Sequence, residues 1–437
     1  MSQVALRKGV GLWSVIALGL GTAVGVSIFS VLAPATAIAG PAMLLSVALA
    51  AVPMFLIAIP YAFMGSALPT AGASFEWTRR FISPEIGFAT SWLRIVSSTG
   101  AMLILALVLV RYASMIIPMP VKPAMLVMYV LVFSLNLLGV DVAARVQTVL
   151  MGVLLAVFAV FIVWGAPSIQ PQSFVPFMPE GWVGALAAVP LLVGLFFGIE
   201  AATEVGDEVR DSRRAIPIGI AASMLAAIAL YLLMAVTALG VLGPQALAAS
   251  ETPLLDAAAV FMGQDVAKLV IVFAAVAAIT KSLNSLCLIF SRYLFAMGRA
   301  GALPAVLSRV HPKFGTPHVA LATAFGFCML GLLLPMNLTS LFLAVNIPSM
   351  IQSIAICLAA AVIARKHPAI YEQARFKLGK RATVASAWVG VASALFVVAL
   401  GFTTDWKPYA ALGVWGLAGL VFYVATGRAK TLRRGDG

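Results

Sequence analysis

The chain has 437 residues, of which 62% are hydrophobic and only 10% are charged, and its formal net charge is +13. A water-soluble domain is usually about 45–50% apolar and about 25% charged, so this composition excludes a soluble protein and indicates an integral membrane protein. The three cysteines all lie in apolar runs without metal-ligand spacing, which indicates small hydrophobic residues rather than a metal site or disulfides.

An all-α membrane protein with twelve transmembrane helices is predicted, because a helix needs about 20 mostly apolar residues to cross the hydrocarbon. The expected spans are 10–32, 41–66, 86–117, 123–139, 145–165, 184–206, 215–242, 266–296, 317–335, 340–364, 383–404 and 408–426. The first apolar run is too long for a signal-peptide core, so we expect it to be retained as a span.

The basic residues are distributed asymmetrically. With a cytoplasmic N-terminus, 22 of the 28 lysines and arginines fall in cytoplasmic segments and four in outside loops. The positive-inside rule then predicts cytoplasmic N- and C-termini. The positive charge is expected to face anionic lipid headgroups, and no nucleic-acid partner is expected. We expect one multi-pass transmembrane domain over 1–426 in the plasma membrane (the inner membrane of a bacterium), with a basic cytoplasmic tail over 427–437.

The first span carries glycines near its middle, in the stretch GTAVGVSIFS from Gly21 to Ser30. Glycine costs about 1 kcal/mol in a helix interior relative to alanine. Broken spans recur in transporters, where freed amides and carbonyls bind ligands. The alternative is close helix packing, because Gly21 and Gly25 also have the spacing of a small-residue contact.

The sixth span has a similar interruption, with Gly194 and Gly198 before Glu200. Interrupted spans at corresponding positions indicate an inverted repeat. The two segments lie five helices apart, which predicts a five-plus-five repeat with broken helices 1 and 6, followed by helices 11 and 12. The expected limits are about 10–165 for repeat one, about 184–364 for repeat two and about 383–426 for the last two helices.

Several motifs resemble the amino acid–polyamine–organocation superfamily of secondary transporters, which has the LeuT-type fold. In chain order they are Gly25-Val26-Ser27-Ile28-Phe29, LPTAGAS (68–74), FFGIEAATEVGDEVRDSRRAIP (196–217), SRYLFAMGRAGALP (291–304) and ARKHP (364–368). Three places depart from the family pattern. Ser27 stands where a second glycine is common, and Asp211-Ser212 stands where Asn-Pro is common. Gly194 stands where arginine-exchanging members place an aromatic residue.

The resemblance implies a substrate site at the two helix breaks. Amides around Gly25–Ser27 would bind a carboxylate at the positive end of a half-helix, and nearby carbonyls would accept from an ammonium. Phenylalanines of the sixth span would cover the ligand, with ordinary packing as the alternative. The expected substrate-binding residues are Ala23, Val24, Gly25, Val26, Ser27, Ile28, Ser98, Phe196, Phe197, Gly198, Ile199 and Glu200.

Charges within spans are expensive and mark functional positions. The expected coupling or gating residues are Arg94, Glu204, Lys281 and Ser282. In sodium-coupled relatives the neighbourhood of Lys281 holds a sodium ion. We expect its ammonium to replace that cation and to be able to carry the coupled proton. The alternative is a structural ion pair with an acid of the sixth span. Glu204 is expected to pair with either Lys281 or Arg94.

Two further acids stand at the cytoplasmic end of the sixth span, Asp207 and Glu208. We expect them to form gate or loop salt bridges with the basic residues that follow them. The expected partners are Arg210, Arg213 and Arg214.

The expected function is secondary active transport of an amino acid by alternating access, without sodium, either proton-coupled or by exchange. Few polar residues are expected to line the site, which favours a neutral, small or apolar substrate. The alternative is a polyamine or other organic amine, which Glu200 and Glu204 would suit. An enzyme is not expected, because the three histidines lie in or beside loops without a catalytic motif. No cofactor or metal is expected, and the protein is expected to be a monomer or weak homo-oligomer.

Overall fold

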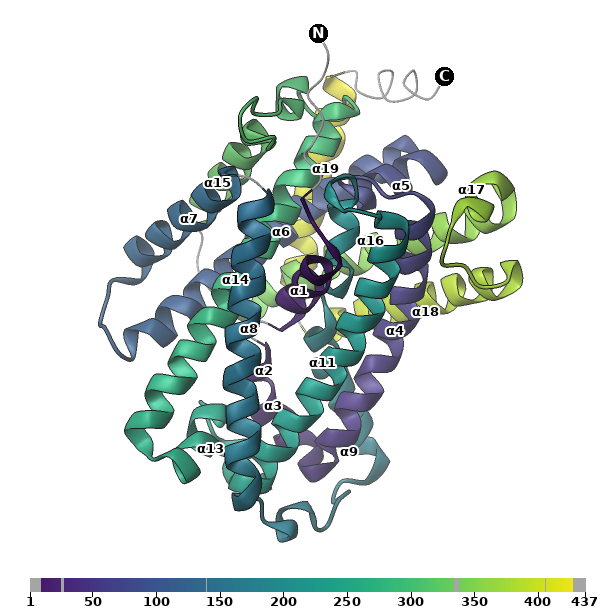
Figure 1. The fold of residues 1–437 in the computed structure, drawn as a ribbon. Coiled ribbons are helices and arrows are strands. Elements are labelled where there is room, and N and C mark those ends of the chain that lie inside the picture. Colours follow the sequence, from purple (N-terminus) through teal and green to yellow (C-terminus); the bar gives the residue numbers. More distant parts are fainter. Residues whose placement is uncertain (1–8, 25–26, 139, 334–337, 405, 427–437) are drawn as a thin grey trace.

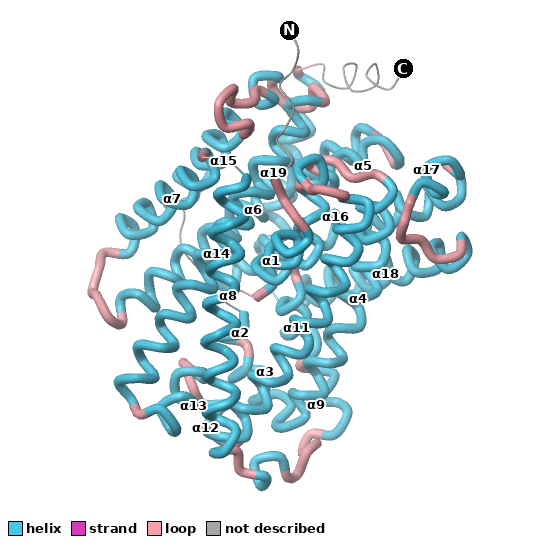
Figure 2. The backbone as a smooth tube through the Cα atoms, viewed as in Figure 1, coloured by secondary structure: helices cyan, strands magenta, loops and turns pink. Residues whose placement is uncertain are grey.

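The computed structural model describes residues 9–24, 27–138, 140–333, 338–404 and 406–426. These residues form helices joined by turns and loops, with two isolated β-bridges and no strand within the described ranges (Figure 2). The α-helices are α1 (Leu12–Ala23), α2 (Ser27–Ser30), α3 (Leu32–Ala39), α4 (Met43–Ala67), α5 (Ala73–Phe81), α6 (Pro84–Ser114), α7 (Val121–Leu137), α8 (Val140–Gly165), α9 (Gly181–Ala187), α10 (Val189–Leu192), α11 (Ser212–Leu242), α12 (Pro244–Ala249), α13 (Pro253–Met262), α14 (Gln264–Arg299), α15 (His318–Gly331), α16 (Leu338–Lys366), α17 (Pro368–Gln373), α18 (Lys380–Thr404) and α19 (Lys407–Ala425). The 3₁₀ turns are η1 (Gly40–Ala42), η2 (Ala166–Ser168), η3 (Pro171–Phe174), η4 (Val193–Phe196), η5 (Ile199–Glu204), η6 (Gly206–Glu208) and η7 (Ala305–Ser308).

Eight helical segments of the described chain are long and apolar enough to cross a membrane, and each coincides with a predicted span. They are Leu32–Ala67, Pro84–Ser114, Thr148–Ser168, Ser212–Leu242, Gln264–Arg299, Ala344–Lys366, Lys380–Ala399 and Lys407–Ala425. The other four predicted spans contain shorter elements. Three of them contain the helices α1, α7 and α15. The fourth contains the short α-helices and 3₁₀ turns from α9 to η5. The count of twelve therefore stays a prediction.

Helix α1 is enclosed by the other long helices. In Figure 1 it lies near the centre, with α7 and α15 on one side of the molecule and α17 and α18 on the other. It packs against α8, α11, α14 and η5. A helix that is apolar on all sides is suited to such burial.

Two large hydrophobic clusters fill the interior. One centres on α1, α4 and α11, and the other on α6, α7 and α15. Helix α14 contributes residues to both clusters, so it lies at their boundary. The clusters indicate two packed bodies that meet along α6, α14 and the interrupted segments.

An aromatic clasp holds α19 against α6. The indole nitrogens of Trp92 and Trp415 each donate to the backbone carbonyl of the other residue, at 2.9 and 2.8 Å. Their rings stack with centroids 4.9 Å apart. Gly419 leaves room for the Trp92 ring, because a Cβ at this position would lie 2.5 Å from it.

This packing predicts different effects on the melting temperature for two alanine substitutions on α19. Gly413→Ala adds a Cβ that meets nothing within 4 Å, so the gain in helix propensity should raise the melting temperature or leave it unchanged. Gly419→Ala should lower it, because overpacking costs about 1–3 kcal/mol. Thermal unfolding of both detergent-purified variants tests this, and equal shifts in one direction would contradict the clasp.

Candidate functional site

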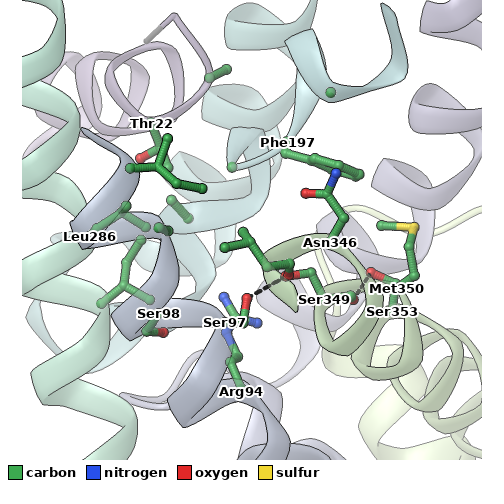
Figure 3. A pocket seen from close by; sticks show the side chains of 18 of the residues that line it. Thr22, Arg94, Ser97, Ser98, Phe197, Leu286, Asn346, Ser349, Met350 and Ser353 are labelled. Atoms are coloured by element: carbon green, nitrogen blue, oxygen red, sulfur yellow. Dashed lines mark hydrogen bonds between the residues drawn. The ribbon is translucent and has the colours of Figure 1, made fainter. Parts of the chain in front are cut away.

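A cavity of about 190 Å³ lies where the two bodies meet. Figure 3 shows its polar and apolar side chains converging from several helices. Its described lining residues come from α1, α4, α6, the segment from η4 to η5, α14 and α16. They are Thr22, Ala23, Met54, Ile57, Arg94, Ser97, Ser98, Ala101, Ile104, Leu105, Gly194, Phe197, Gly198, Ala201, Leu286, Ile289, Val345, Asn346, Ser349, Met350 and Ser353. Sites for drug-sized ligands are commonly about 300–1,000 Å³, so this cavity suits a smaller molecule.

The two interrupted segments touch each other beside the cavity. Helix α1 ends at Ala23, and the sixth segment breaks between η4 and η5, at Phe197 and Gly198. Gly198 has a φ of +95°, and a Cβ there would lie 2.2 Å from the Thr22 side chain. Only glycine fits both the backbone angle and the contact. The break thus has a backbone reason at Gly198, whereas a Cβ at Gly194 would meet nothing within 4 Å.

Lys281 lies on α14, and its fully buried side chain reaches the C-terminal end of α1. Its ammonium donates to the carbonyl of Gly21 at 3.1 Å and to the carbonyl of Val24. The Ser282 hydroxyl also donates to the Gly21 carbonyl, at 2.6 Å. Helix ends leave carbonyls without intrahelical partners, and a cation is the favourable partner at a C-terminus. Lys281 therefore caps the C-terminal end of α1.

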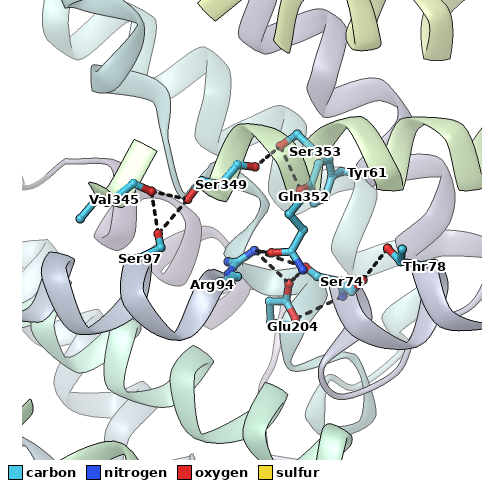
Figure 4. A network of polar contacts seen from close by, with 10 residues as sticks. All are labelled: Tyr61, Ser74, Thr78, Arg94, Ser97, Glu204, Val345, Ser349, Gln352 and Ser353. Carbon is cyan, nitrogen blue, oxygen red and sulfur yellow. Dashed lines mark hydrogen bonds and ion pairs between the residues drawn. The ribbon is translucent and has the colours of Figure 1, made fainter. Parts of the chain in front are cut away.

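A polar network includes Arg94 and other residues that line the cavity (Figure 4). Arg94 of α6 lies 3.8 Å from the Glu204 carboxylate, and its guanidinium also donates to Gln352 of α16. The Ser74 hydroxyl donates to Glu204, and the Arg94 guanidinium approaches the same hydroxyl at 3.4 Å. Of the two predicted partners of Glu204, the structure brings it against Arg94.

Two further ion pairs follow along the sixth segment. Glu208 forms two contacts with Arg292, at 2.6 and 2.9 Å, and both side chains are fully buried. Asp207 pairs with Arg299 at 3.3 Å, with about a third of each side chain exposed. All three acids lie on 204–208, and all three bases lie on α6 or α14.

The partners of Asp207 and Glu208 differ from those expected. The predicted partners were the arginines that follow in sequence, Arg210, Arg213 and Arg214, and this was wrong. Arg213, for example, donates to the backbone carbonyl and side chain of Gln373. The turns after η6 carry these arginines away, while α14 brings Arg292 and Arg299 alongside the acids.

The backbone next to these acids is held by neighbouring segments. The amides of Gly9 and Val10 donate to the Glu208 carbonyl at 3.1 and 3.0 Å, and the Arg210 amide donates to Val10. The Gly72 amide donates to the Glu204 carbonyl at 2.9 Å. Acids, bases and backbone contacts together join residues 204–208 to α6, to α14 and to the segments around Val10 and Gly72.

Most of the predicted site residues fall into three groups. Ala23, Ser98, Phe197, Gly198 and Arg94 line the cavity. Glu204, Lys281 and Ser282 lie next to it in the contacts described above. Gly25 and Val26 lie outside the described residues, as do the side chains of Ser27, Ile199 and Glu200.

The remaining predictions concern buried apolar residues. Val24 and Ile28 are fully buried. Phe196 was expected to cover the ligand, but its buried ring packs edge-on against Tyr231, with centroids 5.7 Å apart. The next residue, Phe197, reaches the cavity instead, because the chain turns out of the 3₁₀ geometry there.

Sequence reasoning missed the polar side chains of α16. Asn346, Ser349 and Ser353 line the cavity at helical spacings of three and four residues. On α6, Ser97 lies beside the predicted Ser98 and donates to the Val345 carbonyl at 2.7 Å. The spacing on α16 was a usable signal, because such residues share one helix face.

A family model described as amino acid permease matches residues 10–419. The chain belongs to the amino acid permease family. The family and the apolar helices make it a multi-pass membrane protein of amino acid transport.

Three relatives illustrate the range of the family. An uncharacterized transporter of Mycobacterium tuberculosis (strain ATCC 25618 / H37Rv) is 32% identical, over 72% of this chain and 71% of the relative. A branched-chain amino acid permease of Bacillus subtilis (strain 168) is 26% identical, over 96% and 93%. A methylthioribose transporter of the same strain is 25% identical, over 84% and 83%. The family thus includes relatives named for different substrates.

The ion pairs predict unequal effects for two methionine substitutions. Arg292→Met should destabilise the protein by about 3–5 kcal/mol, because it leaves the Glu208 carboxylate buried without its partner. Arg299→Met removes a partly exposed pair and should cost about 0–1 kcal/mol. Thermal unfolding in detergent compares them, and a similar melting temperature for both variants would refute the buried pair's role.

Proposed function

We propose that the protein is a secondary active transporter that moves a neutral, small or apolar amino acid by alternating access, without sodium. Transport is either proton-coupled or by exchange. In this proposal 1–426 form a single transporter domain of twelve spans, with the five-plus-five inverted repeat and helices 11 and 12. The domain lies in the plasma membrane with both termini cytoplasmic.

One observation carries the proposal: a small cavity lies against both interrupted segments. Thr22 and Ala23 line it from the end of α1, and Phe197 and Gly198 line it from the other break. Irregular backbone at membrane depth is tolerated where it is buried in protein or lines a cavity. Substrate sites of secondary transporters lie at such breaks.

The charge of the lining supports a neutral substrate side chain. Arg94 is the charged residue among the described lining positions, and Glu204 stands against it. Neither an acidic nor a basic side chain of a substrate finds an unbalanced charge there. The same pairing weighs against a polyamine, because Glu204 is already engaged.

The α-carboxylate is assigned to the amides at Gly25–Ser27, as the family resemblance implies. The Val24 carbonyl already accepts from Lys281. The ammonium of the substrate is therefore assigned to the carbonyls near Ala23, Phe196 and Phe197.

Lys281 is proposed as the cation that replaces sodium. Its ammonium and the Ser282 hydroxyl occupy the carbonyl ligands at the end of α1. A sodium ion would need those oxygens, because hard cations are bound by oxygen ligands. Release of the substrate to the cytoplasm then requires the acids of 204–208 to separate from the bases of α6 and α14.

A binding screen tests the substrate class. Detergent-purified protein is heated with neutral amino acids, or with the amines that correspond to them after decarboxylation. A ligand that binds only the folded state raises the melting temperature by mass action. We expect the amino acids to stabilise the protein and the amines to have no effect. Stabilisation by amines or polyamines alone would refute the carboxylate site and favour the amine alternative.

Replacement of the buried lysine tests the coupling. Lys281→Met keeps an unbranched apolar side chain, but it leaves the Val24 carbonyl without its donor and the Gly21 carbonyl with Ser282 alone. We expect uptake in proteoliposomes to fall at least tenfold and its dependence on pH to be lost. Ser282→Ala, which removes one of two donors to Gly21, should retain most activity. Wild-type uptake and pH dependence in Lys281→Met would contradict the coupling role.

A further inference from the structure

Asn346 is the polar residue of the cavity wall that the transport proposal leaves without a role. It lies on α16 and lines the cavity, and in Figure 3 its amide extends toward Phe197. No hydrogen bond joins this amide to any residue of the described part of the chain. An amide offers both donors and an acceptor, so a ligand in the cavity can supply the missing partner.

The neighbouring hydroxyls, in contrast, donate within the protein. Ser97 and Ser349 donate to the Val345 carbonyl at 2.7 and 3.0 Å. Ser353 donates to the Ser349 carbonyl at 3.0 Å. Thr22, on the other side of the cavity, donates to Leu18 at 2.8 Å. These donors stabilise the helices around the cavity rather than a ligand.

The same contacts hold Asn346 in place. Two hydroxyls bind the carbonyl of Val345, the residue directly before it. Pro348 follows two positions later and lacks an amide hydrogen, so α16 loses one helical hydrogen bond at this point. The backbone next to Asn346 is thus fixed from α6, which suits a residue that recognises a ligand by geometry.

We propose that Asn346 recognises an uncharged hydrogen-bonding group, a hydroxyl or amide, on the side chain of the substrate. The inference rests on the proposed function and narrows its substrate class to neutral amino acids with a polar side chain. The main chain of the substrate is assigned to the helix breaks at Ala23 and Phe197. Its side chain then faces α6 and α16, where Asn346 lies.

Threonine and valine provide the test, because they have nearly the same shape and differ in one hydroxyl. A hydrogen bond of ordinary strength corresponds to about a three- to tenfold preference for threonine over valine. Affinities are measured by thermal shift and by competition for uptake in proteoliposomes. The ratio of the two affinities is the readout, so a change in protein yield or activity does not affect it.

Asn346→Leu removes the amide at similar volume and should bring the threonine-to-valine ratio to about one. Met350→Leu is the matched control, because Met350 lines the cavity one turn further along α16 and carries no hydrogen-bonding amide. We expect this variant to keep the wild-type ratio. Asn346→Ala provides a second test if the leucine variant does not fold.

Two results would overturn the inference. The first is a wild-type threonine-to-valine ratio within twofold of one. The second is an unchanged ratio in both Asn346 variants, and if both ligands are then weakened equally, Asn346 contacts the main chain of the substrate. If no amino acid binds the wild-type protein, the proposed function itself fails, so the two failures are distinguishable.

Discussion

The hydrogen bonds from Lys281 to the end of α1 are the interaction on which the site depends. A helix that stops inside a membrane leaves carbonyls that water cannot reach, and each costs several kcal/mol without a partner. Lys281 and Ser282 supply donors from α14 to the carbonyls of Gly21 and Val24. The partner of a buried charge is here a set of backbone dipoles, so the lysine and the broken helix stabilise each other.

The second constraint is steric and comes from Gly198. Because its missing side chain lets Thr22 approach, the two interrupted segments pack closely at this position. The cavity forms around that contact, between the cluster of α1, α4 and α11 and the cluster of α6, α7 and α15. A small movement of one body against the other changes the shape of the cavity directly, because both bodies supply its walls.

Much of this arrangement was predictable from the sequence, for a physical reason. Long apolar segments and the distribution of basic residues are properties of single helices, and eight predicted spans coincide with long helices. The glycine-rich centres also carry their own signal. Pairing between charges that are distant in the sequence leaves no such local signal. Arg94 lies 110 positions before Glu204, and nothing local distinguished it from Lys281 as a partner.

The side of a helix that faces the cavity was equally hard to predict. Phe196 and Phe197 are identical in type and adjacent, yet one packs on Tyr231 and the other lines the cavity. The local change from a 3₁₀ turn to extended backbone at Phe197 decides between them. Asn346 was visible in the sequence only as a neighbour of Pro348. The role proposed for it depends on α6, because Ser97 of that helix donates to the carbonyl of the preceding residue, Val345.

In the proposed transport cycle, the charges of residues 204–208 and of α6 and α14 have a consequence for how a substrate leaves. Glu204, Asp207 and Glu208 all belong to one wall, and Arg94, Arg292 and Arg299 all belong to the other. Separation of the walls would create a passage with negative charge on one face and positive charge on the opposite face. An amino acid carries both signs at once. Such a passage would orient the departing zwitterion across the gap, with its ammonium toward one wall and its carboxylate toward the other.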